Sequence, residues 1–252
     1  MRPCFVLAAP MNVQRTLCPE QVRAFHLDIF VTDQVRDFAA ISPCTEGGIT
    51  DMGGGCGYFA RELARRLPSA TLTVTDVDDA SLAVCATLGV ATIKADAFFY
   101  KPQMEECGCF NLILHHLVGG GESATRALQV GALNNWRGRH VFVNEYIYDA
   151  WIGDLAGRLI YALTSTSALS FARRAVGKLF PALNANTSGV GVRFRSRRAW
   201  ERLFREAGFE VTASTRGSSE HVHWLLSPLV HEIRRDSFML RSDHIRASPA
   251  KA

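Results

Sequence analysis

The residues with the clearest chemical meaning form a glycine-rich loop that begins with Asp51 and has glycines at alternate positions, Gly53, Gly55 and Gly57. A short extended segment precedes the loop, and a helical pattern follows it. Glycines are needed where a strand turns sharply into a helix and the backbone must approach a ligand closely, because a Cβ atom there would clash. The spacing therefore predicts a ligand-binding turn at this place.

The loop differs from the fingerprint of dinucleotide-binding proteins. That fingerprint, Gly-x-Gly-x-x-Gly, requires a glycine at position 58 when counted from Gly53, and the chain has Tyr58 there. The carboxylate of Asp51 would repel a pyrophosphate but would attract a cationic or amine-bearing ligand. S-Adenosylmethionine (SAM) carries both a sulfonium and an amino group, so SAM suits this loop better than a dinucleotide does.

Two further aspartates, Asp76 and Asp96, follow the next two predicted strands, 70–75 and 91–94. The carboxyl ends of parallel strands lie at one edge of a sheet, so we expect these side chains to gather around one ligand. Asp76 can accept hydrogen bonds from both hydroxyls of a ribose, Asp96 can accept one from an adenine amino group, and Phe98 can cover the ring. The candidate cofactor-binding residues are Asp51, Gly53, Gly55, Gly57, Asp76, Val77, Asp96, Ala97 and Phe98.

Asp51-x-Gly-x-Gly-x-Gly57, Asp76 and Asp96 resemble the cofactor motifs of class I SAM-dependent methyltransferases. The resemblance covers residues 46–215. It implies an α/β, Rossmann-like fold: a seven-stranded, mostly parallel sheet with helices on both faces and one antiparallel strand near the C-terminus. It also implies that Gly53 and Gly55 pass under the methionine part of SAM, that Asp76 binds the ribose and that Asp96 binds the adenine.

Length and composition agree with one globular α/β domain, since 252 residues can bury a large core without disulfides. The net charge of +4 is too small to indicate a nucleic-acid partner, and no apolar stretch approaches the roughly 20 residues of a membrane span. The seven cysteines are scattered and lack zinc-site spacing, so we expect no metal and a reducing, cytoplasmic compartment.

The pattern along the chain predicts an N-terminal helical segment, a methyltransferase domain and a flexible tail, over residues 1–45, 46–241 and 242–252. Apolar periodicity and stop signals predict helices over 19–41, 58–67, 78–88, 123–136 and 197–207. Short apolar or alternating runs predict strands at 48–50, 70–75, 91–94, 110–114, 140–143, 209–215 and 236–241. No strand is evident from 146 to 192.

A second group of reactive side chains follows the fourth and fifth predicted strands, with His115 and His116 after the fourth and Glu145 after the fifth. Histidine titrates near neutrality, so it can remove a proton from a hydroxyl while that oxygen attacks a methyl carbon. A carboxylate at the neighbouring strand end can hold such a histidine in the correct tautomer. The alternative is that the histidine only caps a turn and Glu145 is solvated.

The stretch Leu114-His115-His116-Leu117 and the following strand ending at Glu145 resemble a segment of small-molecule O-methyltransferases related to plant caffeic-acid and bacterial polyketide enzymes. In that family a Leu-His-Asp-Trp stretch supplies the catalytic base, and a glutamate after strand five orients it. The resemblance implies that His115 is the base and Glu145 its partner. The chain departs from the family at His116-Leu117, and only about 45 residues precede the loop. His116 stays a rival base, and the oligomeric state is left open.

Residues 146–192 are predicted to form a helical cap, inserted after strand five, that covers the substrate. The segment is rich in aromatic residues, which favours a small apolar or aromatic methyl acceptor and the exclusion of water. The aromatic residues are Tyr146, Tyr148, Trp151, Tyr161, Phe171 and Phe180. The alternative is that two helices here simply complete the core.

Six arginines between 193 and 205 could attract an acidic substrate or carrier protein, although such a run is more often the solvated face of a helix. They are Arg193, Arg195, Arg197, Arg198, Arg202 and Arg205. Alternative functions are a nucleic-acid or protein methyltransferase, methylation of nitrogen, sulfur or a carboxylate by proximity without a base, and an inactive fold that only binds partners.

Overall fold

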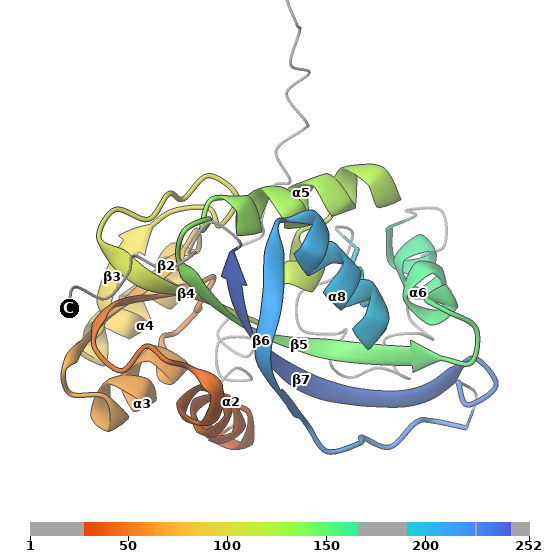
Figure 1. Ribbon diagram of the computed structural model, residues 1–252, viewed down its shortest axis with the longest axis horizontal. Helices are drawn as coiled ribbons and strands as arrows, with labels where there is room; N and C mark the ends of the chain where they lie inside the picture. The colour runs from red at the N-terminus through yellow and green to blue at the C-terminus, as the bar shows by residue number, and fades with distance from the viewer. Residues whose placement is uncertain (1–27, 166–190, 225, 243–252) are drawn as a thin grey trace, which may run out of the picture.

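The computed structural model describes residues 28–165, 191–224 and 226–242. The first part of the predicted N-terminal helix, the cap residues Phe171 and Phe180 and almost all of the predicted tail lie outside these ranges. Seven strands form one sheet at the centre of the described part (Figure 1). In spatial order they are β3 (Ala91–Lys94), β2 (Ala70–Asp76), β1 (Gly47–Met52), β4 (Glu105–Asn111), β5 (His140–Ala150), β7 (Val230–Ser242) and β6 (Phe209–Arg216).

Strand β7 runs antiparallel to both of its neighbours, and the other strand pairs are parallel. The described helices are α2 (Asp28–Ile41), α3 (Tyr58–Arg66), α4 (Asp79–Thr87), the 3-10 turn η1 (Leu114–His116), α5 (Glu122–Asn134), α6 (Leu155–Ser165) and α8 (Arg197–Glu206). The predicted fold class, a mostly parallel seven-stranded sheet with flanking helices, is confirmed.

Helices cover both faces of the sheet because successive residues of its strands point to opposite sides. In β5, Phe142 packs in the cluster under α2 and α3, whereas Val141 and Val143 pack in the cluster under α5 and α8. Figure 1 shows these two helix layers below and above the strands. Helix α2 is also fixed by Asp37, whose Oδ2 accepts hydrogen bonds of 2.8 Å from the hydroxyls of Thr215 and Ser237.

Strand β4 differs from the prediction, because it spans Glu105–Asn111 instead of 110–114. Its centre, Cys107-Gly-Cys109, has two fully buried thiols, and a side chain at Gly108 would collide with the ring of Trp136. Cysteine here acts as a small buried apolar residue. The two glutamates at the start of the segment and the glycine at its centre do not look like a buried strand, so the strand was predicted too late in the sequence. The strand ends early because the next residue, Leu112, has a φ of 55° and turns the chain into η1.

Strands β5 and β7 are much longer than predicted, so the prediction of no strand from residue 146 onward is wrong for residues 146–150. The register pairs His140 with Arg241 at one end and Ala150 with Val230 at the other. The segment predicted as a cap, 146–192, therefore starts inside a strand, and its first described helix is α6, which begins at Leu155. The last strand was predicted too short because its first half reads as a charged surface segment.

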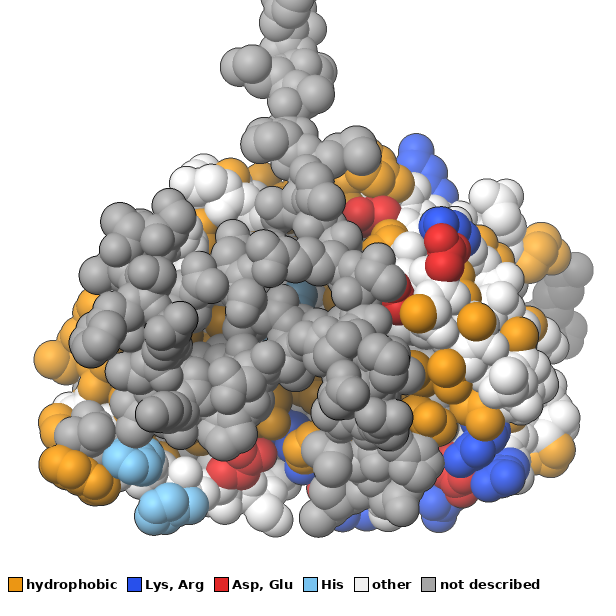
Figure 2. Space-filling model, turned by 180° about the vertical axis from the view of Figure 1, so that it is seen from behind, with side chains coloured by type: hydrophobic (Ala, Val, Ile, Leu, Met, Phe, Trp, Pro, Cys, Tyr) orange, Lys and Arg blue, Asp and Glu red, His pale blue; other side chains and the backbone are white. Residues whose placement is uncertain are grey.

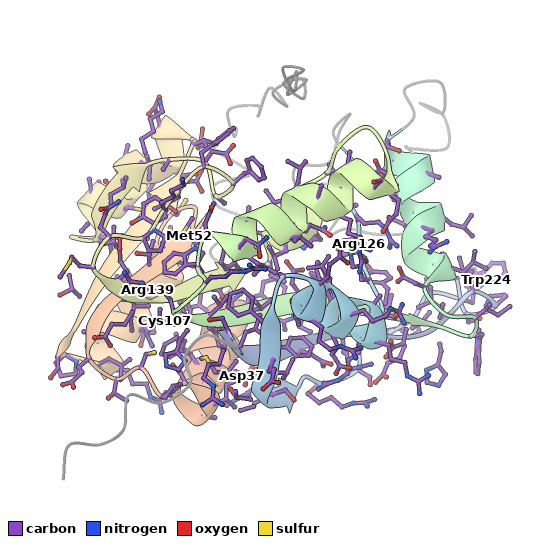
Figure 3. The ribbon with its side chains drawn as sticks, turned by 45° about the horizontal axis from the view of Figure 1, so that its top comes forward. Asp37, Met52, Cys107, Arg126, Arg139 and Trp224 are labelled. Atoms are coloured by element: carbon purple, nitrogen blue, oxygen red, sulfur yellow. The ribbon has the colours of Figure 1, made fainter. Side chains whose placement is uncertain are left out.

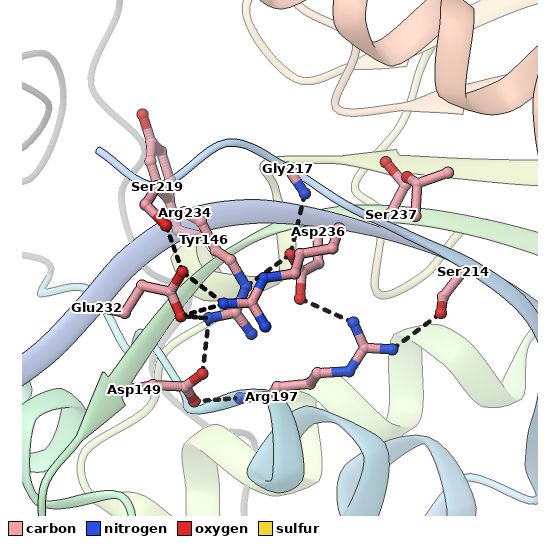
Figure 4. A network of polar contacts seen from close by, with 12 residues as sticks. Tyr146, Asp149, Arg197, Ser214, Gly217, Ser219, Glu232, Arg234, Asp236 and Ser237 are labelled. Carbon is pink, nitrogen blue, oxygen red and sulfur yellow. Dashed lines mark hydrogen bonds and ion pairs between the residues drawn. The ribbon is translucent and has the colours of Figure 1, made fainter.

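The charged residues of β7 are instead buried in a network of ion pairs (Figure 4). The guanidinium of Arg234 is almost fully buried and binds Asp149 on β5 at 2.7 Å, together with Glu232 and Asp236 on its own strand. A buried charge is tolerated only when it is paired and hydrogen-bonded. Arg197 of α8 completes the pairing by binding Asp236 at 2.9 Å.

The end of the molecule beyond β5 and β7 carries exposed apolar side chains. Trp151, Ile152 and Trp224 are among the most exposed large hydrophobic residues of the described ranges. Figure 3 shows Trp224 at this outer end, and Figure 2 shows hydrophobic and histidine side chains gathered there, at the lower left of the view. No helix among the described residues is long and apolar enough to cross a membrane.

Candidate active site

The predicted glycine loop joins β1 to α3 at the carboxyl edge of the sheet. Gly53 and Gly55 have φ values of 63° and 53°, which other residues rarely adopt. A side chain at Gly53 would also collide with Ile113, which lies just before η1. At Gly55, in contrast, an added Cβ would meet no heavy atom within 4 Å, so the loop has open space there. The turn thus leaves room for a ligand and lies against the segment that carries the histidines.

Asp51 is buried beneath this loop, near the end of β1. Its Oδ1 accepts a hydrogen bond of 2.9 Å from Asn111 at the end of β4. Burial raises the pKa of Asp51 to about 7, against the opposing effect of the Asn111 hydrogen bond, and the charge of Asp76 raises it further. A Cβ on Gly54 would lie 2.4 Å from Asp51 Oδ2, so that glycine is needed as well. Neither Gly54, which lies between Gly53 and Gly55, nor Asn111, which reaches Asp51 from the neighbouring strand, was predicted as a site residue.

Asp76 ends β2 and contacts the loop directly. Its Oδ2 accepts a hydrogen bond of 3.0 Å from the amide of Gly55, and its Oδ1 accepts one of 2.9 Å from the amide of Asp78. Burial raises the pKa of Asp76, and these backbone hydrogen bonds lower it in part. A carboxylate oxygen can accept more than one hydrogen bond. The carboxylate therefore supports the loop and keeps acceptor capacity for hydroxyl groups of a ligand.

The third predicted group lies after β3. Asp96 is exposed, and its Oδ1 accepts a hydrogen bond of 2.7 Å from the amide of Phe98, while Ala97 is buried. The Phe98 ring packs where a side chain on Gly131 of α5 would otherwise be. Val77, directly after Asp76, is partly buried. Asp96 and Phe98 are thus fixed side by side at the same sheet edge as Asp76.

His115 and Glu145 form a buried pair, as the sequence predicted for neighbouring strand ends. His115 Nδ1 lies 2.7 Å from Glu145 Oε2, and both side chains are excluded from solvent. Glu145 Oε1 accepts a hydrogen bond of 2.7 Å from the amide of Leu114 and one of 3.3 Å from that of His115. A carboxylate only accepts, so Nδ1 is the donor, which leaves Nε2 as the acceptor nitrogen of the neutral imidazole. The alternative of a solvated Glu145 is wrong.

His116, the rival base, lies beside His115 with ring centroids 4.2 Å apart. Desolvation lowers the pKa of His116 well below its usual range, and the neighbouring charge of His115 acts in the same direction. No carboxylate contact is recorded for His116 among the described residues, in contrast to the Glu145 contact of His115. The geometry favours His115 as the residue prepared to accept a proton.

Aromatic rings surround His115. The ring of Phe194 lies 4.8 Å from the imidazole, and that of Tyr146 lies 6.3 Å from it, both as centroid distances. Tyr148 stacks on Phe194 at 4.5 Å. Phe194 was not predicted to line the site, because it follows the predicted cap, 146–192, in the sequence.

The other described aromatic residues of the predicted cap point elsewhere. Trp151 is exposed and donates a hydrogen bond to the carbonyl of Ser227, so the prediction that it lines a substrate cover is not supported. Tyr161 of α6 donates to the carbonyl of Gly119 in the loop after η1.

The six arginines do not form one basic face. Arg193 and Arg195 are buried and pair with Glu122 of α5, so the prediction of a single solvated or acid-binding cluster is wrong for them. Arg197 pairs with Asp236 and Glu201. The remaining three, which are exposed on α8, are Arg198, Arg202 and Arg205.

Comparison with family models gives no match, and a search of curated protein sequences gives none either. Solved structures do match. The mitomycin 7-O-methyltransferase MmcR superposes with a TM-score of 0.55 at 13% identity, over 88% of this chain and 56% of that one. A SAM-dependent methyltransferase from Thermotoga maritima gives a TM-score of 0.53 at 16% identity, over 88% of this chain and 94% of that one.

The magnesium protoporphyrin IX methyltransferase of Synechocystis, solved with bound S-adenosylhomocysteine, gives 0.53 at 13% identity, over 88% and 86% of the two chains. At such identities the likeness shows the fold, which is that of class I SAM-dependent methyltransferases. The chain spans only about half the length of some matched structures, 56% of MmcR and 57% of a further match, TnmH.

Proposed function

We propose that this protein binds SAM at the loop between β1 and α3 and transfers its methyl group to a hydroxyl oxygen of a small apolar or aromatic molecule. His115 is the general base and Glu145 orients it. The observation that carries the proposal is the buried contact of 2.7 Å between His115 Nδ1 and Glu145 Oε2. This pair lies just after Ile113, which packs against the glycine loop.

The residues present fit SAM. Gly55 faces open space, Asp76 keeps acceptor capacity for ribose hydroxyls, and Asp51 offers a buried carboxylate to a cationic group. Asp96 and Phe98 are assigned to the adenine, with Val77 and Ala97 beside them. SAM supplies an electrophilic methyl group when bound.

The protein's own residues then manage the proton of the acceptor. His115 Nε2 accepts the hydroxyl proton as the oxygen attacks, and Glu145 stabilises the imidazolium that forms. The aromatic rings of Phe194 and Tyr146 around the imidazole favour an apolar or aromatic acceptor. Of the predicted cap, 146–192, we assign the part that begins with α6 to the substrate cover.

Nucleic acid is disfavoured as the acceptor, because Arg193 and Arg195 are internally paired and do not contribute to a basic surface.

A direct experiment would incubate the purified protein with methyl-labelled SAM and a panel of phenols, catechols and hydroxyquinones, with thiols, amines and carboxylic acids in parallel. We expect S-adenosylhomocysteine to form with a hydroxyl compound. Turnover only with thiols, amines or carboxylates would contradict O-methylation and would indicate transfer by proximity. No binding of SAM at all would contradict the whole proposal.

SAM affinity should depend on pH through Asp51. With a pKa of about 7 in the free protein, Asp51 is half ionised at pH 7 and mostly protonated at pH 6. The ionised form attracts the cationic ligand, so affinity should fall about fivefold from pH 7 to pH 6, following the ionised fraction. Calorimetry at the two pH values measures this change. Asp51→Asn should remove most of the pH dependence, and an unchanged pH dependence in that variant would assign it to another group.

We assign the enzyme to the reducing cytoplasm, which the free thiols support. Five of the seven cysteines lie in the described residues, and all five are buried and unbridged. Burial raises the pKa of Cys85 to about 12, and such thiols react slowly in the folded state. Thiol titration without reductant should therefore leave at least these five unreacted in native protein. All seven should react after unfolding, and five or fewer would contradict the assignment.

A further inference from the structure

The backbone of the turn that carries His115 is held from three sides. Glu145 of β5 accepts the amide hydrogens of Leu114 and His115. Gln129 of α5 donates from Nε2 to the carbonyl of Leu114 at 2.9 Å, and the amide of Arg193 donates to the carbonyl of His115 at 2.9 Å. Both amides and both carbonyls of two consecutive residues are therefore bound by other elements.

The side-chain amide of Gln129 has its orientation determined by Arg195. Its Oε1 accepts two hydrogen bonds from Arg195, of 3.0 Å from Nε and 2.7 Å from Nη2. Because the guanidinium can only donate, the amide oxygen must face Arg195, and the amide nitrogen must face Leu114. Gln129 is fully buried and Arg195 nearly so. A chain of directed hydrogen bonds thus runs from Arg195 to the residue next to the base.

The charges behind this chain are balanced. Glu122 accepts from Arg195 Nη1 at 2.7 Å and from Arg193 Nε at 2.6 Å, and Asp154 accepts from Arg193 Nη2. Two cations meet two anions in a largely buried place. An apolar group of the same volume is often as stable as such a network. Stability alone therefore does not account for it, whereas fixed geometry at an adjacent reacting group does.

We infer that Gln129 and Arg195 are positioning residues for the base: through the carbonyl of Leu114 they hold the η1 turn so that the His115 imidazole stays on Glu145. The inference rests on the proposed function of His115. The backbone amide of Arg193 holds the same turn through its hydrogen bond to the carbonyl of His115. A displacement of about 1 Å at a reacting group can lower a rate 100-fold.

The variant Gln129→Glu separates the two contacts of Gln129. Its carboxylate still accepts from Arg195, but it cannot donate to Leu114 and repels that carbonyl. The probe is the His115 imidazole itself, observed by NMR of protein labelled with ¹⁵N-histidine and assigned by the loss of its signals in His115→Gln. This measurement needs no acceptor.

We expect wild-type protein to show one tautomer, with the proton on Nδ1 and slow exchange. In Gln129→Glu the Nδ1 proton should exchange faster and the two tautomers should mix, because the contact with Glu145 is weaker. A wild-type imidazole spectrum and exchange rate in this variant would overturn the inference. If Gln129→Glu does not fold, Arg195→Lys, which keeps the charge but not both hydrogen bonds, takes its place with the same expected result.

A matched control is Leu63→Ala. Leu63 is fully buried in α3 on the opposite face of the sheet, so its loss destabilises the fold without touching the turn. Its His115 spectrum should match wild type at a temperature where the protein is folded. Equal spectral changes in Leu63→Ala and Gln129→Glu would mean general loosening and would contradict a positioning role.

Turnover with the phenol panel separates this inference from the proposed function. Gln129→Glu should lower turnover about tenfold or more with SAM affinity unchanged. If His115→Ala keeps full turnover, the assignment of the base fails. If His115→Ala loses turnover while Gln129→Glu keeps both turnover and the wild-type spectrum, only the positioning role fails.

Discussion

Replacing His115 by alanine is expected to lower the turnover of methyl transfer by roughly 10²–10⁴-fold, the usual contribution of a positioned general base. The imidazole is buried against Glu145 and has aromatic neighbours, so it faces the acceptor side of the proposed site. Affinity for SAM should therefore stay close to that of wild type. Single-turnover kinetics with an acceptor from the phenol panel, and calorimetry with SAM, measure the two quantities separately.

Glu145→Gln should show a smaller loss in the same direction. Glutamine keeps an oxygen that can accept from the Leu114 amide, but it cannot stabilise the imidazolium by charge. Residues that act as one unit are not additive. The double variant should consequently be little worse than His115→Ala alone, and strictly additive losses would argue that the two residues act independently.

His116→Ala is the matched control, because His116 is the adjacent histidine with a low pKa. It should retain most of the turnover. The reverse result, with His115→Ala near wild type and His116→Ala inactive, would move the base by one residue. If both variants keep full turnover, the acceptor needs no base. A thiolate, a free amine and a carboxylate are acceptors of that kind.

The parts of the site that could be predicted are those set by residue type and strand position. Asp51 and Asp76 lie at or near the carboxyl ends of their strands, and Glu145 directly follows Asn144, the last residue of β5 that pairs with β4. In a parallel sheet these positions share one edge whatever the details of packing. His115 follows β4 at the same edge and meets Glu145 across 30 residues of sequence. Local sequence was enough for these predictions.

The buried arginines could not be predicted, because their burial depends on partners far away in the chain. Arg193 is stabilised by Glu122 and Asp154, and Arg234 by Asp149, which is 85 residues distant. Seen alone, a run of charged residues is typical of a solvated surface. The same effect concealed the first half of β7, whose charges are neutralised only once β5 and α8 are in place.

The extent of β4 was hidden for a different reason. Its central residues, Cys107 and Cys109, have modest strand propensity, and the strand ends at a leucine with a left-handed backbone conformation, Leu112. Such a conformation is rare for leucine and is maintained by surrounding structure, here a hydrogen bond of 2.8 Å from the Leu112 amide to the carbonyl of Asn144. Strained residues cluster at functional sites, and this one directly precedes the turn that carries the proposed base.

Asp76→Ala is expected to lower the affinity for SAM at least tenfold. The proposed contacts of Asp76 with ribose are charge-assisted hydrogen bonds, each worth roughly 1.5–3 kcal/mol. The structure adds a second reason, because Asp76 also accepts the amide hydrogens of Gly55 and Asp78 and so fixes the loop itself. Calorimetric titration of wild type and variant with SAM measures the difference.

Asp79→Ala is the control for this prediction. Asp79 is an exposed carboxylate three residues further along the chain, paired with Lys94 on the surface at 2.6 Å, so its removal changes the charge equally without touching the loop. Its SAM affinity should lie within about twofold of wild type, as exposed ion pairs contribute little. Equal losses of SAM affinity in the two variants would mean that the effect of Asp76→Ala comes from the change in net charge alone. Unchanged affinity in Asp76→Ala, with the fold intact by circular dichroism, would remove Asp76 from the cofactor site and with it the central carboxylate of the proposed binding mode.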